Sequence, residues 1–144
     1  MTILSKKDVR KCYVNWITFA LGCQNMERMM APAFVRMFGL VSEKLYDSKE
    51  EQQKLLDRHT QFFNTEEAFG SIIPGVILGM EEKRAEGEEI PDELIQSTKT
   101  ALMGPFVGMG DSLIGGTLRP ILCSIAMGLS ASTGSIAGQL FYCV

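Results

Sequence analysis

Charged residues are almost absent from the last third of this sequence. Between residues 100 and 144 the only acidic and basic residues are Asp111 and Arg119, whereas the first 99 residues hold the other 29 charges. A soluble domain of this size places charge on every surface segment, because each element has one face in water. A segment without charge on all sides is expected to contact lipid or protein all round. The scarcity therefore predicts a membrane protein whose last third is embedded.

Other scarcities exclude several function classes. The single histidine, His59, has no serine or cysteine placed beside it by any motif, and a lone histidine on an apolar helix face is usually a packed core residue. The four cysteines lack CxxC or metal-ligand spacing, which favours reduced thiols. No basic patch, dinucleotide fingerprint or P-loop is present. We therefore expect no catalytic residue, no cofactor, no metal ion and no nucleic-acid partner.

The first half of the chain predicts three amphipathic helices. Residues 6–22 carry apolar residues at helical spacing behind a basic first turn, with Ser5 as N-cap. This helix either packs on a core or lies on a membrane surface with Trp16 at the boundary. Residues 25–38 show a methionine-rich stripe. Residues 42–63 are densely charged on what we interpret as a solvated face, with His59 and Phe62 turned toward a core.

After residue 67 the composition changes. Residues 68–80 are uncharged and contain glycines and Pro74, and 13 residues of helix extend only about 20 Å, short of a bilayer core of about 30 Å. A buried helix or a re-entrant half-span fits this length. Residues 120–144 are long enough for a tilted span, with Gly134 and Gly138 spaced for close helix contact.

The expected architecture is all-α, with N-terminal amphipathic helices followed by glycine-rich broken or re-entrant helices and a membrane-spanning segment. Residues 1–67 form the predicted cytoplasmic or interfacial part, and residues 68–144 the predicted membrane-embedded part. Residues 104–116 read as an irregular glycine-rich loop. Because an unpaired charge at membrane depth is costly, Asp111 and Arg119 should pair with each other or with the backbone of this loop. The basic residues 6–11 predict a cytoplasmic location for the N-terminal part.

Five motifs in a fixed order then carry a family resemblance. They are NMERM at 25–29, HTQFFNT at 59–65, MEEK at 80–83 followed by Ala85 and Gly87, LMGP at 102–105, and GDS at 110–112 followed by GTLRP at 116–120. In this order and spacing the chain resembles the IID membrane subunit of mannose-type sugar phosphotransferase systems, over the N-terminal half of that family. It departs from the family's pattern at Met26 and at residues 114–115, where aromatic residues are typical.

The resemblance implies a non-catalytic permease subunit in the bacterial cell (inner) membrane. Its partners would be a IIC membrane subunit, soluble IIA and IIB phosphocarriers, membrane lipid and a hexose or related sugar, in an oligomeric complex. A sugar held in a bilayer needs polar groups from a cavity lining. The residues expected to serve the sugar path or subunit assembly are Glu27, Arg28, Asn64, Glu81, Gly108, Gly110, Asp111, Ser112, Thr117 and Arg119.

Two alternatives from other classes stay open at this point. One is a truncated homologue acting as a soluble or peripheral helical interaction or regulatory protein, with residues 100–144 buried in an oligomer core. The other is a small enzyme using Asp111 and Arg119, which lacks an evident nucleophile or metal site. Partitioning separates the first alternative, because a membrane component needs detergent for extraction.

Overall fold

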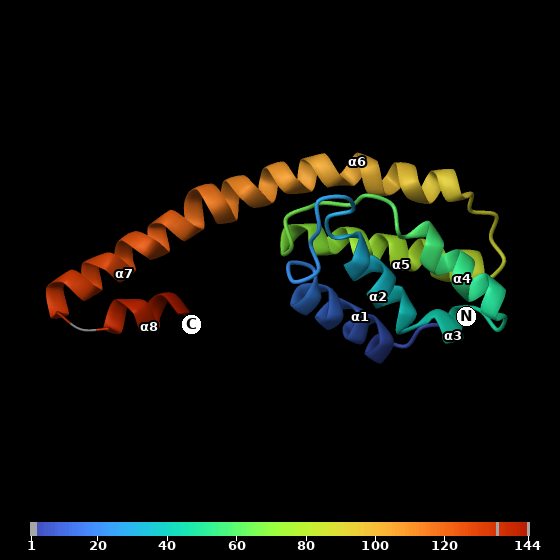
Figure 1. Ribbon diagram of the computed structural model, residues 1–144, viewed down its shortest axis with the longest axis horizontal. Coiled ribbons are helices and arrows are strands. Elements are labelled where there is room, and N and C mark those ends of the chain that lie inside the picture. The colour runs from blue at the N-terminus through green and yellow to red at the C-terminus, as the bar shows by residue number, and fades with distance from the viewer. Residues whose placement is uncertain (1–2, 135, 144) are drawn as a thin grey trace. The chain divides into compact units, whose positions relative to one another are not determined.

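The regular structure of the described residues is helical, with turns and loops between the helices. The computed structural model describes residues 3–134 and 136–143, and among these the only β pairing is an isolated bridge between Met29 and Phe63. The structure divides into two compact units, Met1–Val107 and Gly108–Val144, which we call unit 1 and unit 2 (Figure 1). The predicted all-α class is confirmed.

Unit 1 is a bundle of short helices. These are α1 (Lys6–Phe19), α2 (Ala31–Gly39), α3 (Ser42–Leu45), α4 (Lys49–Arg58), the 3-10 helix η1 (Phe69–Ser71), α5 (Ile72–Ala85) and the first part of α6 (Asp92–Gly110). As predicted, Ser5 caps α1. Its hydroxyl accepts from the Asp8 N–H while the Asp8 carboxylate accepts from the Ser5 N–H, so the helix begins with a capping box.

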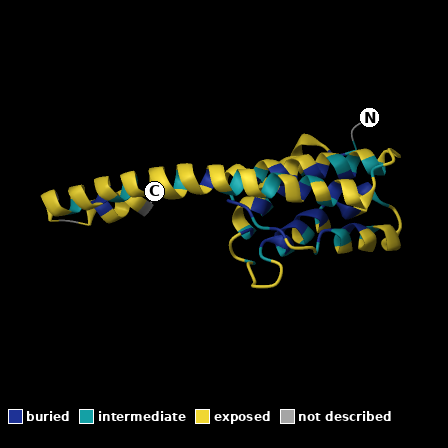
Figure 2. Ribbon diagram, turned by 90° about the horizontal axis from the view of Figure 1, so that it is seen from above, coloured by how far each residue is buried: buried dark blue, intermediate teal, exposed yellow. Residues whose placement is uncertain are grey.

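An aromatic cluster forms the centre of unit 1. The Trp16 ring meets Phe34 and Phe63 edge-on, with centroids 5.3 and 5.8 Å apart, and its indole N–H donates to the Glu67 carbonyl at 3.2 Å. Trp16 is fully buried, so the expectation that this side chain would lie at a membrane boundary is wrong, whereas the outer face of α1 is not tested by this burial. Buried positions line the inward sides of the unit 1 helices in Figure 2.

Several predicted helix boundaries are wrong because side chains and local turns interrupt the periodic pattern. Residues 42–63 do not form one helix: an extended Tyr46 separates α3 from α4, and Ser48 caps α4. Phe62, expected in the core, is 54% exposed. Residues 25–38 do not form one helix either, since the Asn25 side chain accepts from the N–H groups of Glu27 and Arg28 and holds a turn there.

The uncharged segment 68–80 folds into η1 and the first part of α5. Ile73 and Ile77 are fully buried in unit 1, which favours the predicted buried helix over a re-entrant half-span. Gly70 has a specific reason for being glycine, because a Cβ there would lie 2.2 Å from the Thr65 hydroxyl oxygen. The close approach of the Thr65 side chain therefore depends on this glycine.

The glycine-rich region is helical, contrary to the predicted irregular loop at 104–116. α6 runs to Gly110, the π-helix η2 follows over Asp111–Leu118, and α7 covers Arg119–Thr133. The departure from α-helical geometry is thus confined to wide turns. In a helix, the backbone N–H and C=O groups bond to each other. A segment with few polar side chains offers these groups few other partners, so the helical hydrogen bonds are favoured.

The membrane-compatible helix also differs from the predicted span at residues 120–144. The stretch Asp92–Ser132, 41 residues long, is long and apolar enough to cross a membrane. α7 ends before Gly134, whose left-handed backbone (φ +60°) closes the helix, and α8 (Ala137–Cys143) follows. Gly134 and Gly138 therefore do not share one helix face as predicted.

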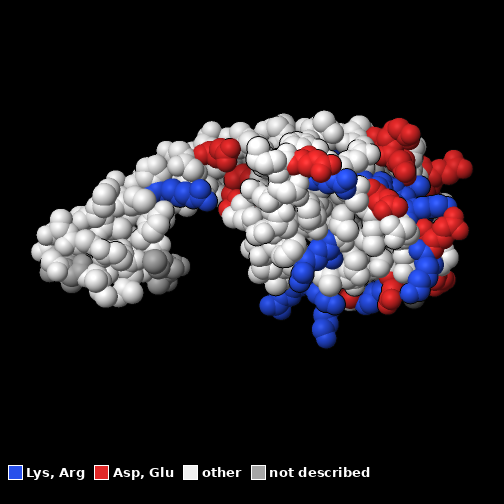
Figure 3. Space-filling model, viewed as in Figure 1, with Lys and Arg blue, Asp and Glu red and all other residues white. Residues whose placement is uncertain are grey.

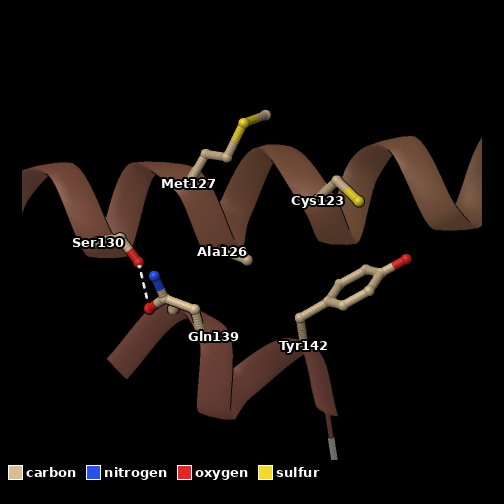
Figure 4. A pocket seen from close by; sticks show the side chains of 7 residues that line it. Cys123, Ala126, Met127, Ser130, Gln139 and Tyr142 are labelled. Atoms are coloured by element: carbon tan, nitrogen blue, oxygen red, sulfur yellow. Dashed lines mark hydrogen bonds between the residues drawn. The ribbon is translucent and has the colours of Figure 1, made fainter. Parts of the chain in front are cut away.

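Gly138 instead brings α8 into close contact with α7. A Cβ at this position would lie 1.9 Å from the Ala126 carbonyl oxygen and 2.2 Å from the Ser130 hydroxyl. The Ser130 hydroxyl also donates to Gln139 Oε1 at 3.0 Å, the bond drawn in Figure 4. The two helices thus form an antiparallel hairpin whose contact requires glycine.

We expect Gly138→Leu to separate α7 from α8. Overpacking of a close contact costs about 1–3 kcal/mol, and here the clashing atom belongs to the backbone. Amide hydrogen exchange of the full chain in detergent should show lost protection in α8. Gly128→Leu is the matched control on α7, because no atom lies within 4 Å of a Cβ there. Equal protection in the two variants would contradict the contact.

Candidate functional site

A buried charged cluster joins three helices of unit 1. Glu81 on α5 is fully buried, and its two carboxylate oxygens lie 2.8 and 2.9 Å from Arg58 Nη1. His59 Nε2 lies 3.0 Å from Glu81 Oε1. Lys99 on α6, only 1% exposed, places its Nζ 3.5 Å from His59 Nδ1 and 4.7 Å from the centre of the Phe34 ring. These interactions satisfy charges that burial would otherwise penalise.

His59 is neutral in this cluster. Its ring stacks on Phe38 at 4.1 Å, and burial lowers the pKa of His59 to about 4 against the hydrogen bond to Glu81. Assigning the ring proton to Nε2 lets His59 donate to Glu81, while Nδ1 accepts from the Lys99 ammonium. A second ring proton would point at that ammonium. The predicted role of His59 as a packed core residue is confirmed by its full burial.

Further ion pairs tie the start of α6 to this cluster. Arg58 Nε lies 2.9 Å from the Asp92 carboxylate, which also pairs with Arg84. The Gln96 side chain donates to the Arg58 carbonyl. Sequence reasoning missed Arg58, which it assigned to a solvated face, and Lys99. A signal was present for Lys99, since it lies on one helix face with the apolar residues Ile95 and Leu102.

The predicted site residues of the first two motifs meet in unit 1. Glu27 and Arg28 are exposed in the turn before α2 and form an ion pair at 3.4 Å. The Phe63 N–H donates to the Arg28 carbonyl, and the Asn64 N–H donates to Met103 Sδ at 3.2 Å. The segments 25–29 and 59–65 are thus brought together, whereas Glu81 belongs to the buried charged cluster.

The other predicted site residues form one helical stretch, which we call the polar segment (residues 108–119). Gly108 and Gly110 end α6, η2 contains Asp111, Ser112 and Thr117, and Arg119 begins α7. The Thr117 hydroxyl donates to the Ser112 carbonyl at 3.0 Å, across the wide π turn. π-Helical turns are rare and occur often at functional sites. The pairing of Asp111 with Arg119 stays a prediction.

Outside the polar segment, unit 2 presents an apolar surface. Figure 3 shows mostly uncharged atoms over α7 and α8, and large exposed apolar side chains include Ile121, Ile125, Met127 and Leu140. Between α7 and α8 lies a pocket of about 440 Å³ (Figure 4). It is lined by Cys123, Ala126, Met127, Ser130, Gly138, Gln139 and Tyr142. Because no charged side chain lines it, the pocket suits an apolar occupant.

The profile of the family described as "PTS system mannose/fructose/sorbose family IID component" matches residues 3–144. The chain belongs to this IID family. It is 41% identical over 143 residues to the sorbose-specific EIID component of Lacticaseibacillus casei, covering 99% of this chain and 50% of that relative. It is 36% identical over 140 residues to the mannose-specific EIID component of Escherichia coli (strain K12), covering 96% of this chain and 49% of the relative.

Solved structures agree with this assignment. In the cryo-electron microscopy structure of the mannose transporter ManYZ with microcin E492, one chain matches with a TM-score of 0.90 and 35% identity, covering 99% of this chain and 52% of that one. A structure described as a membrane protein matches with a TM-score of 0.84 at 36% identity. The IID chain thus spans about half the length of the relatives it matches. The predicted family and the bacterial inner-membrane location are confirmed, which favours the membrane component over the soluble alternative.

Proposed function

We propose that this IID chain helps form a sugar translocation path together with a IIC membrane subunit. The observation that carries the proposal is the polar segment, a π-helical turn with hydroxyl and carboxylate groups in a helical stretch whose only charged residues from 100 to 132 are Asp111 and Arg119. Polar groups at membrane depth must face protein or a cavity, because lipid cannot hydrogen-bond to them. Ser112 and Thr117, with Asp111 as acceptor and Arg119 as donor, suit the hydroxyls of a hexose or related sugar.

The exposed turn at Glu27 and Arg28, beside Asn64, is the part of unit 1 that we assign to subunit assembly. Its ion pair is exposed, with side chains 80% and 48% accessible, so a partner carboxylate or guanidinium can reach it. Glu81 has a different role, since its full burial supports a structural function and not contact with sugar. The soluble IIA and IIB subunits complete the proposed complex.

The proposed subunit is non-catalytic. A phosphoryl carrier needs an exposed imidazole beside groups that stabilise about two negative charges. His59 is fully buried, stacks on Phe38, and already lies 3.0 Å from the Glu81 carboxylate, which would repel a phosphoryl group. We therefore expect no acid-labile phosphate on this chain after incubation with phosphorylated IIB.

The proposal is tested by sugar uptake in membranes that contain this chain with its IIC, IIA and IIB partners. Ser112→Ala combined with Thr117→Val should weaken sugar binding by roughly 30-fold, because each hydrogen bond contributes about 1 kcal/mol. Ser124→Ala, at an exposed serine on α7 outside the polar segment, is the matched control and should leave uptake unchanged. Co-purification with IIC reports assembly separately. Unchanged sugar affinity in an assembled complex would overturn the proposed path, and failure to associate with IIC would overturn the proposed partnership.

A further inference from the structure

The outer surface of α1 is strongly basic at its beginning. Four exposed cations lie in its first two turns: Lys6, Lys7, Arg10 and Lys11. The one acidic residue there, Asp8, is already engaged, because Lys44 Nζ lies 2.7 Å from its carboxylate and Ser5 donates to it. Among the residues that the structure describes, none forms an ion pair with these four cations, so their positive charge is uncompensated there. In Figure 3, basic side chains project from the part of unit 1 where α1 lies.

A shallow hollow of about 440 Å³ accompanies these cations. Lys7, Arg10 and Lys11 line it together with Asn15 and other side chains of α1. Asn15 Oδ1 is buried and has no hydrogen-bond partner among the described residues. The hollow thus offers cations for the phosphate of an anionic lipid headgroup.

The same helix becomes apolar on its outward side as it continues. Tyr13 and Ile17 of α1 are 52% and 37% exposed, and Leu21, in the turn that follows the helix, is 54% exposed. Ile72 and Val76 of α5 are 53% and 41% exposed. The two helices are neighbours: a groove between them is lined by Tyr13 and Trp16 on one side and by Pro74 and Gly75 on the other. The exposed apolar surface therefore extends from α1 onto α5.

We propose that α1 docks on the surface of an anionic phospholipid bilayer. Its cations contact lipid phosphates, and Tyr13, Ile17 and Leu21 enter the boundary between headgroups and acyl chains. Amphipathic helices bind membranes through this combination of apolar area and positive charge, each surface cation contributing attraction to anionic lipid. A lipid surface is the occupant because this chain is a membrane component and the uncompensated charge is positive. The proposal does not depend on the sugar path.

Photo-cross-linking of the full chain in lipid vesicles tests this docking. Benzoylphenylalanine in place of Tyr13 should form lipid adducts, detected by mass spectrometry, in vesicles of phosphatidylcholine mixed with phosphatidylglycerol. The same group at Asp47, an exposed position between α3 and α4, is the control and should form few. Equal lipid adducts at both positions, or equal adducts in phosphatidylcholine alone, would overturn the proposal.

Neutralising the cations of α1 tests whether their charge contributes to lipid docking, or whether position 13 merely lies near lipid. Lys7→Gln with Lys11→Gln should lower the adduct yield at position 13, with binding weakened by about 5-fold per cation removed. Lys49→Gln with Lys54→Gln, two exposed lysines of α4, is the matched control and should leave the yield unchanged. Helical circular dichroism checks that each variant is folded. An unchanged yield in the first pair, or adducts formed only with protein, would assign the surface to a protein partner instead.

Discussion

Glu81→Ala should destabilise this protein by about 3–5 kcal/mol. The substitution removes the carboxylate that lies between Arg58 and His59. The positive charges of Arg58 and Lys99 then stay buried without this negative charge to balance them. Breaking a buried ion pair by removing one partner has this cost because the remaining charge keeps its desolvation penalty. Chemical denaturation of the full chain in detergent, followed by circular dichroism, measures the difference in the free energy of unfolding.

Two further variants test whether the loss of stability arises from the burial of Glu81. Glu88→Ala removes a carboxylate that is 57% exposed and paired with Lys83, and should cost less than about 1 kcal/mol. Combining Glu81→Ala with Lys99→Met should cost less than the sum of the two single changes, because both belong to one network. If Glu81→Ala cost no more than Glu88→Ala, the cluster would not hold α6 against α4 and α5.

The stability of the native protein should fall by roughly 3 kcal/mol as the pH drops through the titration of His59. The unfolded imidazole takes up a proton near pH 6.5, whereas burial keeps the folded one neutral down to about pH 4. Between these values the unfolded state binds more protons, so acid favours unfolding. The stabilisation is fully present above pH 6.5 and is lost as the pH falls toward 4.

His59→Gln isolates this contribution from the titration of carboxyl groups elsewhere. We expect lower stability of the variant at neutral pH, because glutamine cannot stack on Phe38 while bonding to both Glu81 and Lys99. Its free energy of unfolding should change less than that of the native protein between pH 6.5 and pH 4. The difference between the two pH profiles, measured by denaturation in detergent, is the test. Parallel profiles would show that His59 is charged in the folded state.

The polar groups of the buried charged cluster and those of the polar segment have different hydrogen-bond partners. In the cluster, the buried Arg58 and Glu81 side chains satisfy each other. In the polar segment, the wide turn bonds Thr117 to the Ser112 carbonyl and leaves the exposed side chains of Asp111 and Ser112 on the surface. This contrast is the physical basis for placing sugar contact in the second and stability in the first.

Composition and short-range pattern alone determined much of this protein. The lack of charge after residue 100 predicted that a membrane-compatible helix is present, although not its bounds, and Ser5 predicted the beginning of α1. The apolar neighbours of His59 predicted its burial. These features depend on solvation and on contacts within one or two helical turns, which residue identities specify directly. The ordered motifs indicated the family for the same reason, since they are themselves sequence.

The tertiary structure alone decided where the polar and glycine residues went. Arg58, Glu81 and Lys99 lie 18 to 41 positions apart along the chain, and only the packing of α4, α5 and α6 makes them partners. Likewise, Gly138 is fixed by a backbone atom of Ala126 in another helix. Local propensity predicted a loop at 104–116, but backbone hydrogen bonding in a stretch with few competing polar side chains favoured a helix. The partners of these residues come from segments that are distant in the sequence. A periodic pattern within one segment carries no information about which distant segment packs against it.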